Sequence, residues 1–118
     1  MKLQLLKTGG IAGIRNSYPI LYATDLSLNE LQKLNRLINH SNFYELPNEI
    51  KSGGYDFIYY TLIIQDNKKY HSVKADFMRI TPELNKLKQL IDYIEHLYLT
   101  RNIKIRDDKI RDDKIKTN

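Results

Sequence analysis

One stretch of the chain decides the fold: Tyr55-Asp56-Phe57-Ile58-Tyr59-Tyr60-Thr61-Leu62-Ile63-Ile64-Gln65. Aromatic and β-branched residues occupy both of its alternating faces, which is typical of a central strand. Asp66-Asn67 follows as a turn, and residues 68–74 are expected to return as the second strand of an antiparallel hairpin. We therefore expect this hairpin to organise the sheet.

Two further strands are expected before the hairpin. Residues 2–7 predict a short strand that is broken at Gly9-Gly10-Ile11-Ala12-Gly13. Residues 14–22 predict a second one, which Pro19 restricts to a sheet edge or a bulge because proline has no N–H to donate. Residues 48–54 are expected to form a polar loop, with Ser52-Gly53-Gly54 giving it freedom in φ.

Two amphipathic helices complete the pattern. The first begins at the capping-box sequence Ser27-Leu28-Asn29-Glu30, ends near Asn39-His40-Ser41-Asn42, and is expected to bury Leu28, Leu31, Leu34 and Ile38. The second begins at Thr81-Pro82 and is expected to bury Leu84, Leu87, Ile91, Ile94 and Tyr98. The order ββαββα predicts an α+β fold, in which a four-stranded, mainly antiparallel sheet carries both helices on one face.

The 118 residues predict one domain at 1–100 and a charged, disordered tail at 101–118. The tail repeats Ile105-Arg106-Asp107-Asp108-Lys109 at 110–114, and a five-residue period turns about 140° per repeat on a helix, so its isoleucines form no stripe. The net charge is +5, of which +3 lies in this tail. Because residues 1–100 are nearly balanced, the charge is a weak footprint for nucleic acid, and we expect no nucleic-acid partner.

The chain has no cysteine, which suits a reducing compartment. Residues 1–7 are too short and too interrupted for the apolar region of a signal peptide, and no stretch approaches the roughly 20 apolar residues of a membrane span. We therefore expect a cytoplasmic protein with no membrane partner, and a monomer.

The sequence contains none of the motifs of an enzyme that we searched for. His40, His71 and His96 lie far apart and predict no metal site, and His71 is expected to have a structural role on its strand. There is no nucleophile elbow and no P-loop, and the glycine-rich segment does not match the dinucleotide-binding fingerprint. We expect no catalysis, no cofactor and no metal.

Tyrosine is abundant, with nine residues against no tryptophan. It offers a large apolar face with a polar tip, which favours protein contacts. Most of the tyrosines are expected to pack across the hairpin. Tyr18 and Tyr55, at loop edges, are the two that we expect to face a partner.

Three segments together resemble the emfourin family, small protein inhibitors of protealysin and related thermolysin-like metalloproteases. Lys7-Thr8-Gly9-Gly10-Ile11-Ala12-Gly13-Ile14 is similar to the family's Gly-Gly-Phe-Ala-Gly segment, with Ile11 in place of Phe. Asp56, Tyr60, Leu62 and Ile64 have the spacing of the family's central strand, and His71-Ser72-Val73 precedes the helix that begins at Pro82-Glu83-Leu84. The resemblance covers about residues 2–98, and the tail after Thr100 has no counterpart in it.

The resemblance implies a proteinaceous inhibitor that blocks the active-site cleft of a thermolysin-like zinc metalloprotease with loops held on a rigid sheet. The zinc would belong to that partner. The residues expected to bind the protease are Gly9, Gly10, Ile11, Ala12, Gly13, Gly54, Tyr55 and Asp56. A cap at the start of its strand is favoured for Asp56 over an approach to the partner's zinc. Two other classes stay open: a non-catalytic protein-interaction module of the same fold with another partner, and a nucleic-acid-binding protein that uses the basic tail.

Overall fold

The computed structural model describes residues 1–10, 13–53, 58–101 and 106–107. Three long strands form the body of the sheet: β1 (Lys2–Gly9), β5 (Ile58–Asp66) and β6 (Lys69–Asp76). Two α-helices accompany them, α1 (Leu28–Ser41) and α2 (Pro82–Thr100). The shorter elements are β2 (Ile14–Ser17), β3 (Leu21–Tyr22), β4 (Glu49–Ile50), β7 (Arg106–Asp107) and the 3-10 turns η1 (Ala23–Asp25) and η2 (Phe43–Glu45).

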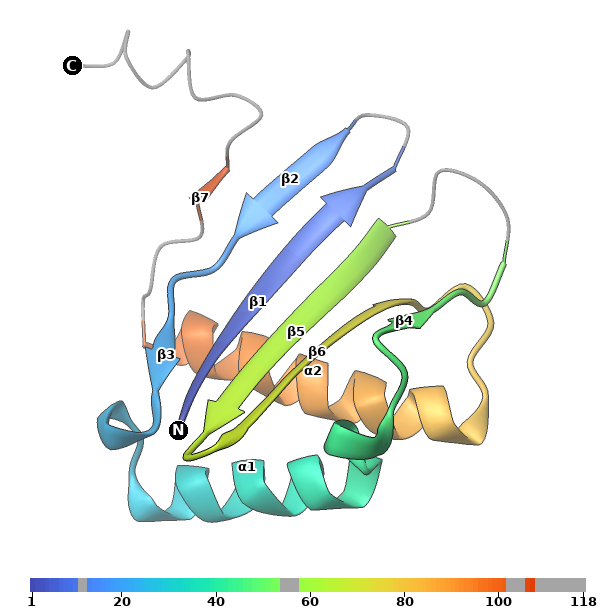
Figure 1. The fold of residues 1–118 in the computed structure, drawn as a ribbon. Coiled ribbons are helices and arrows are strands. Elements are labelled where there is room, and N and C mark those ends of the chain that lie inside the picture. Colours follow the sequence, from blue (N-terminus) through green and yellow to red (C-terminus); the bar gives the residue numbers. More distant parts are fainter. Residues whose placement is uncertain (11–12, 54–57, 102–105, 108–118) are drawn as a thin grey trace, which may run out of the picture.

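The strands lie in the order β4-β6-β5-β1-β2-β7, and β3 also pairs with β1 (Figure 1). The pairings are antiparallel except between β4 and β6, which run parallel. The predicted hairpin is confirmed, since β5 and β6 pair from Tyr59–Asp76 to Asp66–Lys69 and Asn67 turns the chain with φ of 54°. The sheet therefore centres on the stretch that the sequence singles out.

One face of the sheet carries the core. Both helices pack there, so their apolar side chains meet those of the three long strands in a single buried cluster. The strand members are Leu3, Leu5, Leu62, Ile64, Val73 and Ala75, and the helix members include Leu34, Ile38, Leu84, Leu87, Leu90, Ile91, Ile94, Leu97 and Tyr98. On the opposite face, Gln4, Ile63 and Ser72 lie side by side on neighbouring strands, and their side chains are half-buried.

The predicted helix ends are confirmed. The Ser27 hydroxyl accepts a hydrogen bond from the Glu30 amide at 3.2 Å, and the Glu30 carboxylate accepts one from the Ser27 amide at 2.8 Å. α1 ends at Asn42, which adopts the left-handed conformation that terminates many helices. The Thr81 hydroxyl caps α2 by accepting from the Leu84 amide at 3.2 Å.

The predicted four-stranded sheet and the order ββαββα are wrong, because the described residues form a sheet of seven strands in the order βββαβββαβ. Pro19 divides the expected strand 14–22 into β2 and β3, which lie along the same edge of β1. β4 lies inside the predicted polar loop, where the Lys74 amide donates to the Asn48 carbonyl at 2.8 Å. β7 pairs with Asn16 and Ser17 of β2.

Two predictions about single side chains are also wrong. Leu28 was expected in the core but is 71% exposed, at the first residue of α1. Tyr18 was expected to face a partner but is buried, with its ring 4.9 Å from that of Tyr98 and its hydroxyl donating to Glu95 at 2.7 Å. Neither described helix is both long and apolar enough to cross a membrane.

Candidate functional site

The glycine-rich segment lies where β1 turns into β2. Gly9, Gly10 and Gly13 all have positive φ, at 103°, 80° and 68°, and the Gly13 amide donates to the Gly10 carbonyl at 3.1 Å. Residues that carry a Cβ rarely adopt such backbone angles, so the turn requires glycine at these three positions. Ile11 and Ala12 lie outside the described residues.

Gly13 is required for its backbone angle and not for close packing. A Cβ placed on it would meet no atom within 4 Å, and the residue is exposed. A partner can approach the backbone closely where no side chain fills the space beside it. The turn therefore leaves open space beside Gly13.

The second predicted contact segment precedes β5 in the sequence. Gly54, Tyr55 and Asp56 lie outside the described residues, but Ile58, which follows them, pairs with Gly9 of β1. The β1–β2 turn and the start of β5 are thus at the same end of the sheet (Figure 1). The fold pairs Gly9 with Ile58, although more than 40 residues separate them in the sequence.

A buried carboxylate ties the segment before β5 to the end of β6. Asp76 has no exposed surface, and its Oδ2 accepts a hydrogen bond from the Ser52 amide at 2.8 Å. Its Oδ1 accepts from the Ser52 hydroxyl and from the Met78 amide, the latter at 3.2 Å. The Arg79 amide donates to the Ser52 hydroxyl oxygen at 3.0 Å. This Ser52–Asp76 network fixes two loops against each other.

The network keeps Asp76 ionised. Burial alone would raise the pKa of the carboxyl, but the hydrogen bonds from Ser52 and Met78 outweigh it, so the pKa lies below its ordinary value. A carboxylate with several fixed donors is a strong organising centre for a loop, because each bond is charge-assisted.

The segment from Phe77 to Ile80 follows this network and was missed by the sequence analysis. Phe77 packs on Tyr60 with ring centroids 6.0 Å apart, whereas Met78 and Ile80 are 62% and 50% exposed. The sequence analysis assigned no role to this connection, and no local pattern in it marks these two side chains as exposed. Gly9, Gly10, Gly13 and Ile58 lie at the same end of the sheet as the end of β6, which these two residues follow, and we call this part of the protein the loop end.

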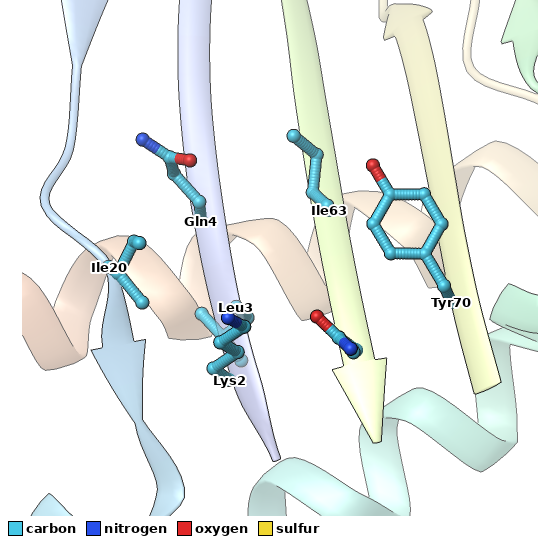
Figure 2. Close-up of a pocket in the computed structure, with 7 residues that line it drawn as sticks. Lys2, Leu3, Gln4, Ile20, Ile63 and Tyr70 are labelled. Carbon is cyan, nitrogen blue, oxygen red and sulfur yellow. The ribbon is translucent and has the colours of Figure 1, made fainter. Parts of the chain in front are cut away.

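A shallow hollow of about 230 Å³ lies at the opposite end of the strands, on the uncovered face of the sheet (Figure 2). Gln4, Ile63 and Tyr70 project into it from β1, β5 and β6, and Ile20 borders it from the connection before β3. Its volume is below the usual range of small-molecule pockets, about 300–1,000 Å³. It is a second exposed surface, separate from the loop end.

His71 has structural surroundings. His71 Nε2 lies 2.6 Å from the Leu46 carbonyl oxygen, and its ring meets the edge of Phe43 at 5.4 Å, as expected for a structural residue. Among the described residues, no three His, Asp or Glu side chains gather in a way that could hold a metal ion.

These features define a small two-layer α+β domain that presents glycine-rich and apolar loops at one end of a rigid sheet. A family model described as Emfourin matches residues 5–92, and the chain belongs to the emfourin family. Comparison with curated proteins and with solved structures gave no match.

Proposed function

We propose that this protein is a proteinaceous inhibitor of a thermolysin-like zinc metalloprotease and acts without catalysis of its own. The observation that carries the proposal is the membership of the emfourin family, whose model spans most of the domain. The loop end is the surface proposed to enter the active-site cleft, with Ile11, Ala12, Gly54, Tyr55 and Asp56 among its contacts.

The physical argument for the loop end rests on its anchors. Gly9 and Ile58 are paired within the sheet, and Ser52 is bonded to Asp76, so the described bases of both loops are fixed before a partner arrives. Loops that are already ordered lose little entropy on docking, which raises affinity for a given contact area. Rigid anchors also resist the extension that proteolysis requires.

The role of the turn is tested with a charged residue at Ala12. Ala12→Glu should raise the inhibition constant at least tenfold, which corresponds to about 1.4 kcal/mol at the contact, while the melting temperature stays within about 2 °C. Gln32→Glu, which adds the same charge at an exposed site on α1, is the control and should inhibit like the unaltered protein. Equal inhibition by both variants would remove the turn from the contact surface.

A second function is favoured by the hollow of Figure 2. A hollow on a sheet face, lined by Ile20, Ile63 and Tyr70 together with polar side chains, suits a non-catalytic interaction module with a different protein partner. Tyr70 is 64% exposed there. If Tyr70→Asp abolishes binding to the natural partner and Ala12→Glu does not, this second function replaces the first.

A further inference from the structure

The segment from Phe77 to Ile80 is held rigidly at both of its ends. On one side it leaves β6 at the buried Asp76, and on the other it enters α2 at Thr81, whose carbonyl accepts from the Asn85 amide at 2.8 Å. Between these anchors the chain exposes two apolar side chains, Met78 and Ile80. Apolar side chains on a fixed backbone can dock on a partner at a low cost in ordering entropy.

The backbone of this segment is already committed to internal hydrogen bonds. The Met78 amide donates to Asp76 Oδ1 at 3.2 Å, and the Arg79 amide donates to the Ser52 hydroxyl at 3.0 Å. A peptide that binds a protease as a substrate is held as an extended strand through its main-chain groups. Because two consecutive amides point inward, the segment cannot be taken up in that form without breaking the Ser52–Asp76 network.

We infer that residues 77–80 are a third part of the protease-binding surface and are presented in a form that the enzyme cannot cleave. The inference rests on the proposed function and deepens it. Met78 and Ile80 offer apolar contacts to the cleft. Ser52 is a positioning residue: its hydrogen bonds keep the peptide bonds between Met78 and Ile80 away from the catalytic groups of the protease. Continuity with the β1–β2 turn supports the assignment, since Gly9, Ile58 and the end of β6 lie at the same end of the sheet.

The contact is tested by placing a charge at the exposed position. Met78→Asp should raise the inhibition constant for a thermolysin-like protease at least tenfold without changing the melting temperature by more than about 2 °C, because desolvating the new carboxylate opposes docking. Leu28→Asp is the matched control, since Leu28 is as exposed as Met78 but lies at the start of α1. Unchanged inhibition by Met78→Asp overturns the inference while leaving the proposed function intact.

The positioning role of Ser52 is tested by the fate of the inhibitor itself. Ser52→Ala should be cut between Asp76 and Ile80 during incubation with the protease, as read from fragment masses, whereas the unaltered protein and Ser52→Thr stay intact. Ser27→Ala destabilises a different part of the fold and is the control for general loss of stability. Survival of Ser52→Ala, or cleavage only outside residues 76–80, overturns the positioning role. Absence of inhibition by the unaltered protein overturns the proposed function and the inference together.

Discussion

At the scale of single residues, Asp76 stands out because it is a charged group without exposed surface. Burying a carboxylate is costly unless fixed donors replace water. Ser52 and the Met78 amide supply those donors, so the cost is offset and two loops become linked. The Ser52–Asp76 pair therefore contributes to stability and also fixes the geometry of the loop end.

The first prediction follows from the pKa of Asp76. Its folded-state pKa lies below the ordinary value of 3.8, so its contribution to stability is present above that pH and is lost as the pH falls through the lower folded-state pKa. As the pH falls below about 4, the unfolding free energy of the unaltered protein should therefore fall more steeply than that of Asp76→Asn.

The measurement is urea denaturation at a series of pH values. At neutral pH Asp76→Asn should be less stable by about 1–3 kcal/mol, because one amide N–H then faces the donors of Ser52. Asp25→Asn, which removes an exposed carboxylate in η1, is the control. Parallel pH curves for the unaltered protein and Asp76→Asn would show that the network does not hold the carboxylate ionised.

At the scale of elements, the helices are specified by their own sequences. The Ser27–Glu30 pair satisfies amides that the first turn of α1 leaves free, and Thr81 does the same for α2. Glu30 also forms an ion pair with Arg101 just after α2, which joins the two helices at one end. Its pKa is lowered chiefly by the Ser27 amide, with Arg101 adding to the effect.

The second prediction concerns this cap. Ser27→Ala should lower the unfolding free energy by about 1 kcal/mol, because the Glu30 amide then loses its acceptor. Thr24→Ala, which removes an exposed hydroxyl in η1, should change it by less than about 0.5 kcal/mol. Chemical denaturation measures the unfolding free energy of all three proteins. Equal values for the unaltered protein and Ser27→Ala would contradict the role of the capping box.

The elements that could be predicted are those whose signals are local. The caps, the β5–β6 hairpin and the stripe of α2 depend on neighbours within a few residues, and all are present. β4 and β7 depend on partners far away in the chain, Lys74 for one and Ser17 for the other, so their own composition gave no signal. Leu28 matched the helical period but is the first residue of α1 and is 71% exposed, which the period alone does not reveal.

The candidate site could be predicted only where glycine marks it. Gly9, Gly10 and Gly13 signal a turn because their angles exclude most side chains, and the structure confirms that turn. The exposure of Met78 and Ile80 depends on how β6 and α2 are placed, which no local pattern encodes. For the contact roles of Gly54, Tyr55 and Asp56, the sequence prediction stands as a proposal.

At the scale of the whole molecule, the two ends of the sheet are different surfaces. The loop end carries the glycine turn and the exposed apolar residues of the β6–α2 connection. The other end carries the hollow bordered by Ile20 and Tyr70 (Figure 2). Both helices pack on one face of the sheet, where the core lies. The exposed residues of the loop end and of the hollow are not part of that core.

The third prediction concerns the tail, which we propose to be separate from the domain at 1–100. Deleting residues 103–118 keeps Arg101 and its ion pair with Glu30, and removes only the two-residue strand β7 from the described sheet. The melting temperature should therefore change by less than about 1 °C, since a contribution of 1 kcal/mol would shift it by several degrees. Calorimetry of both chains makes the comparison, and a fall of several degrees would show that the tail packs on the domain.

The central claim is that the loop end fills the active-site cleft of a thermolysin-like metalloprotease. The most direct measurement is a titration of peptide hydrolysis by such an enzyme, preferably one from the same source, with and without a small active-site-directed inhibitor already bound. We expect loss of activity at a one-to-one ratio, an intact mass for this protein after incubation, and weaker binding when the small inhibitor occupies the cleft. No inhibition at micromolar concentration, or binding that the small inhibitor leaves unchanged, would contradict the claim.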